Sequence, residues 1–210
     1  DFIDDIKKIC KLYETRKKKS NNLDYDDLLT EWIKLLKTTP SANERFTRQF
    51  RYVLVDEYQD TNRLQFDIIK LLGAYHKNVL VVGDDAQSIY SFRAADLRNI
   101  LDFPSEFTGT KIFKLQTNYR SVTPILNVAN NVIQRNQHQF QKVLVGTRAN
   151  AAADRPNLIP VKDMYSQSAF IAQRVIEMKE EGLPLGEIAV LYRAHYQSAE
   201  LELELVKRGV

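Results

Sequence analysis

The sequence predicts an α/β fold in which a helical segment precedes parallel β-sheet. Apolar residues recur at helical spacing through the first fifty residues, and beyond Phe50 short β-rich runs alternate with helical stretches. Such alternation is typical of parallel sheets, because each crossover helix returns the chain to the same end of the sheet. The 210 residues, 44% of them hydrophobic, suffice for one sizeable core or two small ones.

Two helices are expected in the first fifty residues, separated by the turn-forming stretch SNNLD. The helical spacing is carried by Ile3, Ile6, Ile9 and Tyr13 in the first helix, and by Leu28, Trp32, Leu35 and Leu36 in the second. Pro40 is expected to end the second helix.

Five β-rich runs are expected as strands, namely RYVLVD, VLVVGD, KIFKLQ, LIPVKD and IAVLYR. Helices are expected over Leu64–Leu72, Pro124–Gln134 and Ser166–Glu180, and Gly182 is expected to end the last of them. The polar interval Thr147–Pro156 predicts a surface loop.

Charge and cysteine content narrow the class of protein. The formal net charge of +3 is too small to identify a partner, although Lys7 to Lys19 carries seven cations against Glu14 alone. Either a solvated helix face or a nucleic-acid contact explains that run. The single cysteine, Cys10, excludes an internal disulfide and is expected to be at least half buried. No apolar segment has membrane-spanning length and the charged start does not resemble a secretory signal, so a cytoplasmic protein without a membrane partner is expected.

A pair of acids follows the first expected strand, in VLVDEYQD at Val53–Asp60. The end of a parallel strand lies at the carboxyl edge of the sheet, where α/β proteins bind ligands. In a nucleoside triphosphatase Asp56 would hold Mg²⁺ and Glu57 would polarise the attacking water. The alternative is that the two acids only cap the next helix.

Two further segments combine rings with cations. VLVVGDDAQSIYSFRAAD interleaves Tyr90, Phe92 and Arg93, which suits single-stranded nucleic acid because bases stack on rings while a guanidinium takes the phosphate. Alternatively, these two rings pack as core. In LQTNYRS, Tyr119 is placed to cover a nucleobase and Arg120 to reach a phosphate, unless the segment merely caps a helix through Ser121.

Taken together and in this order, these segments resemble the superfamily 1 DNA helicases of the UvrD/Rep/PcrA type. DEYQD is similar to the second motif of that family, GDDAQSIYSFRAAD to the third and NYRS to the fourth, while LDYDDLL and IAVLYRAHYQSAELE fit the flanking pattern. The chain departs from the family in having Ser91 and Ala94 where glycine is common and Phe92 where tryptophan is common. Stacking survives the phenylalanine, whereas the loss of two glycines predicts a stiffer loop.

The resemblance implies an ATP-dependent motor that moves 3′ to 5′ on single-stranded DNA and unwinds duplex DNA, with ATP and Mg²⁺ bound. Asp56 would ligate Mg²⁺ and Glu57 would activate water, while Gln87 would sense the γ-phosphate. Tyr119 would stack on adenine and Arg120 would act as an arginine finger. The remaining implied roles are DNA contacts, made by Tyr90, Phe92 and Arg93.

The phosphate-binding loop of such a motor needs Gly-Lys followed by Ser or Thr, and none of the seven glycines is followed by lysine. The family places this loop upstream of LDYDDLL. The resemblance therefore predicts an internal fragment made of parts of two RecA-like parallel-sheet domains. Residues 1–22 would end an inserted helical subdomain, 23–114 would form the later half of the first RecA-like domain, and 115–210 would open the second. The fragment alone is expected to be inactive.

Two functions remain open on the sequence: a piece of a DNA helicase, or a truncated protein that binds nucleic acid or a partner without motor activity. An RNA helicase of the other large superfamily is disfavoured, because its second motif usually reads Asp-Glu-Ala-Asp or Asp-Glu-x-His, whereas the motif of this chain has Gln59 and then Asp60.

Overall fold

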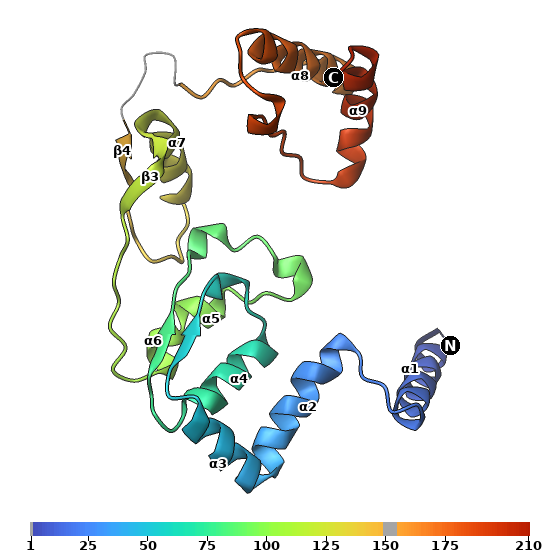
Figure 1. Cartoon of the computed structure of the whole chain (residues 1–210), viewed down its shortest axis with the longest axis vertical. Helices are drawn as coiled ribbons and strands as arrows, with labels where there is room; N and C mark the ends of the chain where they lie inside the picture. The colour runs from blue at the N-terminus through green and yellow to red at the C-terminus, as the bar shows by residue number, and fades with distance from the viewer. Residues whose placement is uncertain (1, 149–154) are drawn as a thin grey trace. The chain divides into compact units, whose positions relative to one another are not determined.

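The computed structural model describes residues 2–148 and 155–210. Three helices open the chain: α1 (Phe2–Lys19), α2 (Tyr25–Thr38) and α3 (Pro40–Gln49) (Figure 1). The two expected helices are confirmed. Pro40 follows the end of α2 and also begins α3, because proline fits the first turn of a helix, where its missing N–H has no partner to lose.

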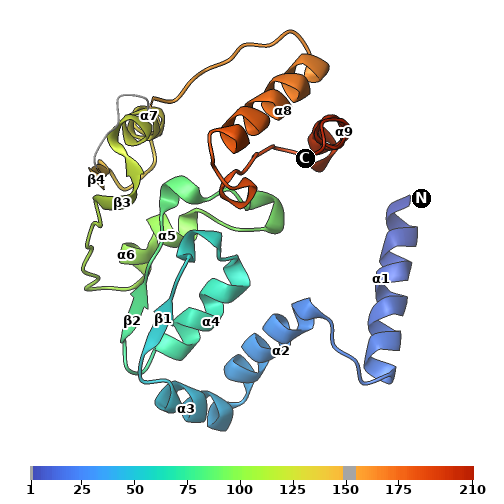
Figure 2. The ribbon, with the colours of Figure 1, turned by 45° about the horizontal axis from the view of Figure 1, so that its top comes forward.

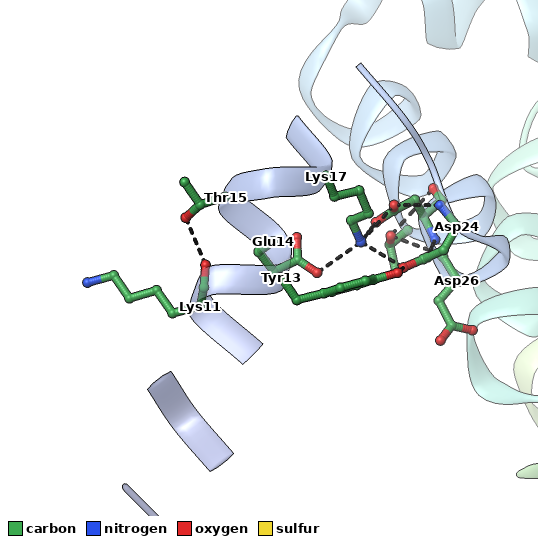
Figure 3. Close-up of polar contacts among 9 residues, drawn as sticks. Lys11, Tyr13, Glu14, Thr15, Lys17, Asp24 and Asp26 are labelled. Carbon is green, nitrogen blue, oxygen red and sulfur yellow. Dashed lines mark hydrogen bonds and ion pairs between the residues drawn. The ribbon is translucent and has the colours of Figure 1, made fainter. Parts of the chain in front are cut away.

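Polar contacts join α1 to α2 through the ammonium group of Lys17, whose side chain is 7% exposed. Lys17 Nζ lies 2.9 Å from Glu14 Oε1, 2.8 Å from Asp24 Oδ2 and 2.8 Å from Asp27 Oδ2. Figure 3 shows Lys17 and Tyr13 pointing from α1 toward Asp24, whose carboxylate also caps α2. The hydrogen bond from Lys17 lowers the pKa of the Asp24 carboxyl. No residue of α1 is buried, and Cys10 is exposed, so the expectation that this thiol packs as a hydrophobe is wrong.

The first sheet pairs β1 (Val53–Val55) with β2 (Val79–Val81) in parallel. Figure 2 shows the two strands side by side, connected by α4 (Arg63–Gly73). The apolar face of α4 packs on the strands together with α5 (Arg98–Leu101) and α6 (Phe103–Glu106). The buried members of this core are Tyr58, Phe66, Ile69, Ile100 and Phe103.

A second core lies between α2 and α4. Ile33 and Leu36 of α2 contact Ile68 and Leu72 of α4, so α4 is covered on the side away from the sheet as well. The helix is apolar on two faces because it has a partner on each.

The second sheet pairs β3 (Thr117–Val122) with β4 (Val145–Arg148), again in parallel, and α7 (Thr123–Ile133) connects them. The buried side chain of Asn130 on α7 binds the backbone of Leu144, the residue before β4, through both its amide nitrogen and its amide oxygen. Its Nδ2 donates to the Leu144 carbonyl and its Oδ1 accepts from the Leu144 N–H, each at 3.0 Å. The α/β fold class is thus confirmed: the chain is helical at the start and then alternates helices with the parallel strands of two small sheets.

The chain groups by contact into two compact units, Asp1–Asp154 and Arg155–Val210. The second unit contains α8 (Met164–Glu180) and α9 (Ser198–Lys207), which contact each other, and its buried apolar side chains are Ala172, Val175 and Leu201. The domain limits predicted at 22 and 114 remain predictions. Within the described residues, no helix combines the length and the apolar character needed to cross a membrane.

Three of the five strand predictions are wrong. KIFKLQ, LIPVKD and IAVLYR have strand-like composition but no regular structure. The NYRS segment, for which no strand was expected, lies in β3, and it precedes the helix α7 as expected. A β-rich run becomes a strand only when a neighbour completes its ladder of hydrogen bonds, and these three runs have no such neighbour among the described residues. Of the loop predicted at Thr147–Pro156, the first two residues belong to β4, and residues 149–154 lie outside the described part.

Candidate functional site

The carboxyl ends of β1 and β2 open into two loops that backbone hydrogen bonds tie together. The Val82 N–H donates to the Val55 carbonyl at 2.8 Å, and the Tyr58 N–H donates to the Val82 carbonyl at 3.0 Å. A Cβ on Gly83 would lie 2.7 Å from Gln59 Oε1, closer than a real side chain permits. Glycine at this position therefore allows the two loops to meet.

Asp56 and Glu57 stand at this edge, as the sequence predicts, and both are exposed. Asp56 Oδ1 accepts the Glu57 N–H at 2.9 Å. Glu57 has a left-handed backbone with φ +48°, a conformation that costs a residue with a side chain about 1–2 kcal/mol. Strain of this kind clusters at functional sites. The next helix, α4, is capped by Asn62 in a capping box with Gln65, so the interpretation of the two acids as its cap is wrong.

The exposed carboxylate of Asp56 fits Mg²⁺ by its chemistry. Mg²⁺ prefers oxygen ligands, keeps several waters and is usually held by one or two carboxylates together with substrate phosphates. Asp56 supplies such a carboxylate at the edge of a parallel sheet, where phosphate ligands bind.

Gln59 lies between the two loops with 1% of its surface exposed. Its Nε2 donates to Glu57 Oε2 at 2.8 Å, and its Oε1 accepts the Asp84 N–H at 3.0 Å. The hydroxyl of Ser88 also donates to the Gln59 carbonyl at 3.2 Å. This buried residue of the second motif thus binds both the Glu57 carboxylate of its own motif and the backbone of the third.

The carboxylate of Asp84 collects three donors. It accepts Gln87 Nε2 at 2.9 Å, the Ala86 N–H at 3.0 Å and the ammonium group of Lys142. Burial acts to raise the pKa of this carboxyl, but the hydrogen bonds from Lys142 and Gln87 outweigh burial and the pKa is lowered. Gln87, expected at the γ-phosphate, is in this structure bound to its own loop.

Lys142 and its neighbour Phe140 bring the segment before β4 against this loop. Lys142 Nζ also lies 4.0 Å from Asp85 Oδ1, and the Phe140 N–H donates to Asp85 Oδ2 at 3.2 Å. Sequence reasoning missed these contacts, because they join residues 55 to 58 positions apart and leave no local pattern.

Tyr90, Phe92 and Arg93 form one surface cluster. The Arg93 guanidinium lies 5.4 Å from the centre of the Tyr90 ring and 5.6 Å from that of Phe92, and the two ring centres are 5.9 Å apart. Phe92 is 67% exposed and Tyr90 is 37% exposed, so the interpretation of these rings as core is wrong. The following residue, Ala94, has φ +62°, a conformation that favours the glycine the family often has there.

Tyr119 and Arg120 lie on β3, in the second sheet, and both are exposed. The Asn118 side chain accepts the N–H groups of Arg120 and Ser121 at 3.0 and 2.8 Å, and Arg148 of β4 donates to the Arg120 carbonyl at 2.7 Å. The backbone of the fourth motif is thereby fixed while the ring and the guanidinium face outward. The residue before α7 is Val122, which makes no side-chain cap, so a capping role for Ser121 is not found.

The structure therefore sorts the predicted site residues into three groups. They are the edge group Asp56, Glu57 and Gln87, the ring and cation group Tyr90, Phe92 and Arg93, and the β3 pair Tyr119 and Arg120. Gln87 shares the loop Gly83–Asp96 with the ring and cation group, whereas Asp56 and Glu57 lie in the loop that follows β1. The β3 pair lies on another sheet.

Comparison with known proteins shows that the chain is similar to DNA helicases. Residues 1–108 match the UvrD/REP helicase N-terminal domain, and residues 113–210 match the UvrD-like helicase C-terminal domain. The chain is 36% identical over 202 residues to the ATP-dependent DNA helicase PcrA of Staphylococcus epidermidis, a match that covers 96% of this chain. It is 35% identical over 198 residues, or 94% of the chain, to PcrA of Staphylococcus aureus. In both cases the match spans 27% of the relative's length. Because the two domain matches together extend over nearly every residue, the chain belongs to the UvrD/Rep family of helicases.

Proposed function

We propose that this chain is a segment of an ATP-dependent DNA helicase, one that carries the catalytic acid pair and a contact surface for single-stranded DNA. The observation that carries the proposal is the loop Gly83–Asp96. At its start Asp84 is hydrogen-bonded through Gln59 to the Glu57 carboxylate, and further along the same loop Tyr90 and Phe92 expose their rings beside Arg93. Nucleotide chemistry and strand contact are thus assigned to two parts of one loop.

On the nucleotide side, Asp56 would hold Mg²⁺ and Glu57 would accept the proton of the attacking water. Mg²⁺, when bound, supplies positive charge that neutralises the phosphates during transfer. Arg120 would stabilise the charge that develops on the γ-phosphate, and Tyr119 would stack on the adenine. Gln87 would reach the γ-phosphate after giving up its hydrogen bond to Asp84.

On the strand side, Tyr90 and Phe92 would stack on bases and Arg93 would bind a phosphate. Closure of two RecA-like domains around ATP would change the grip on the strand, and repeated cycles would unwind duplex DNA. The 3′ to 5′ direction rests on the family alone, and the cytoplasmic location stays a prediction.

The 210 residues are proposed to lack ATPase activity by themselves, because their sequence contains no Gly-Lys-Ser or Gly-Lys-Thr with which to cradle the phosphates. The exposed apolar side chains of Phe113, Leu115, Leu158 and Leu191 support the proposal that the two domains are partial, since they lie in β-rich runs that have no strand partner among the described residues. The alternative function is that of a protein that binds nucleic acid without motor activity. Such a protein would bind single-stranded DNA but would show no ATP hydrolysis for a substitution at Glu57 to slow.

The test is Glu57→Gln in the full-length protein that contains this segment, measured by ATP binding and by DNA-stimulated ATP hydrolysis. Loss of a positioned general base should leave ATP affinity nearly unchanged and slow turnover by about 100-fold or more. The purified 210 residues serve as a second sample and should hydrolyse ATP at the background rate. Unchanged turnover in the full-length variant would refute the catalytic assignment.

A further inference from the structure

The buried side chain of Gln59 has no role in the proposed chemistry of ATP hydrolysis or strand binding. It has 1% of its surface exposed, yet its amide reaches an exposed carboxylate, that of Glu57, over 2.8 Å. On its other side the amide oxygen accepts the backbone N–H of Asp84 at 3.0 Å.

The orientation of this amide is fixed by its partners. The Asp84 N–H can only donate and the Glu57 carboxylate can only accept, so Oε1 must face the former and Nε2 the latter. A flipped amide would set two donors against each other and an oxygen against a carboxylate. Asp60 Oδ2, 3.5 Å from Nε2, disfavours the flip further, because it is another acceptor on the same side.

We propose that Gln59 is a positioning residue for Glu57, holding its carboxylate in one place and linking it to the loop that carries Asp84 and Gln87. This inference rests on the proposed function. A glutamate at an exposed edge would otherwise sample several rotamers, and a general base acts efficiently only when it is held within hydrogen-bond reach of the water. The same amide couples Glu57 to the loop after β2, because a shift of the Asp84 backbone would move Gln59 Oε1 and with it Nε2, the atom that binds Glu57.

Gly83 supports the same assignment. Its missing side chain leaves the space in which Gln59 Oε1 sits, since a Cβ there would approach that oxygen to 2.7 Å. The close approach of the two loops and the bridging amide therefore depend on each other.

Two variants separate the halves of the bridge in the full-length protein. Gln59→Met keeps the length of the side chain and removes both hydrogen bonds. Gln59→Glu keeps an acceptor for the Asp84 N–H and replaces the donor to Glu57 with a repelling oxygen. The control is Gln65→Met, which removes a capping amide of similar length, 2.9 Å from the Asn62 N–H, on α4.

Both Gln59 variants should lower kcat by about 10- to 100-fold with KM for ATP within about threefold, as expected when a catalytic group is misplaced. Gln65→Met should leave kcat unchanged. In the Glu57→Gln background, Gln59→Met should add no further loss of turnover, because the group that it positions is already gone. Independently of activity, amide hydrogen exchange at Asp84 should speed up in Gln59→Met and stay slow in Gln59→Glu.

The outcomes distinguish this inference from the function on which it rests. If Glu57→Gln slows hydrolysis but the Gln59 variants do not, or if their losses multiply in the double variant, Gln59 is merely structural and the helicase assignment stands. If Glu57→Gln leaves turnover unchanged, both proposals fall. Should Gln59→Met not fold, the isosteric Gln59→Glu decides the question alone.

Discussion

Replacing Lys142 by methionine should destabilise the first unit, because this side chain connects the segment before β4 with the loop after β2. Its ammonium group binds the Asp84 carboxylate in a largely enclosed place, where the two side chains are 17% and 24% exposed. A hydrogen bond to a charged group is worth about 1.5–3 kcal/mol. Asp84 keeps its donors Gln87 and Ala86 in the variant, so the loss should not exceed that range.

The free energy of unfolding should fall by about 1.5–3 kcal/mol in Lys142→Met, which for a unit of this size lowers Tm by roughly 3–12 °C. The measurement is thermal and urea unfolding at neutral pH. Lys7→Met is the matched control: its ion pair with Asp4 spans 3.5 Å, but the side chains are 73% and 63% exposed, and such pairs contribute about 0–1 kcal/mol. Equal, small losses in both variants would refute the argument.

Acid should weaken the same contact. The pKa of Asp84 is lowered in the folded state, so its stabilisation is fully present above the unfolded pKa of about 3.9 and disappears as the pH falls through the folded value. Lys142→Met should flatten the decline of stability below about pH 4, because the variant has less of this contribution to lose. If the stability of Lys142→Met falls as steeply with acid as that of the unmodified protein, the decline is due to other carboxyl groups.

Three further predictions concern the loop and the fourth motif. In the full-length protein, Phe92→Ala should cost about 1–3 kcal/mol of single-strand affinity with little change in Tm, since the ring is exposed, and Phe92→Trp should bind as well or better; a clear fall in Tm for both would remove Phe92 from the strand site. Ala94→Gly should raise stability by up to about 1 kcal/mol, because relief of the left-handed backbone outweighs the added chain entropy, and a lower Tm would contradict the φ of +62° as a source of strain. Arg120→Ala should slow ATP hydrolysis by about 10³–10⁵-fold and leave nucleotide-free DNA affinity nearly unchanged; parallel losses in both would place the guanidinium on the strand.

The five helices expected from the sequence all formed to within a few residues, whereas only two of the five expected strands did, and α3, α5 and α6 were not expected. The spacing around Leu28 and Trp32 predicted α2, and Leu64–Leu72 lies within α4 as observed. KIFKLQ had equally good strand composition and formed none, while VGTR, with a central glycine, became β4. Helical hydrogen bonds lie within the segment that makes them, but a strand depends on a neighbour elsewhere in the chain.

The family and the residue types at the sheet edge could be predicted from the sequence alone, because the motifs are continuous in the chain and Asp56 and Glu57 directly follow an apolar, β-rich run. The sequence also placed the rings and Arg93 in one loop. The exposure of Phe92, the hydrogen bonds between Gln59 and the loops after both strands and the ion pair between Lys142 and Asp84 became visible in the folded structure alone. Exposure and hydrogen-bond partners depend on which segments meet in space, and residues 25 to 58 positions apart meet only after the chain has folded.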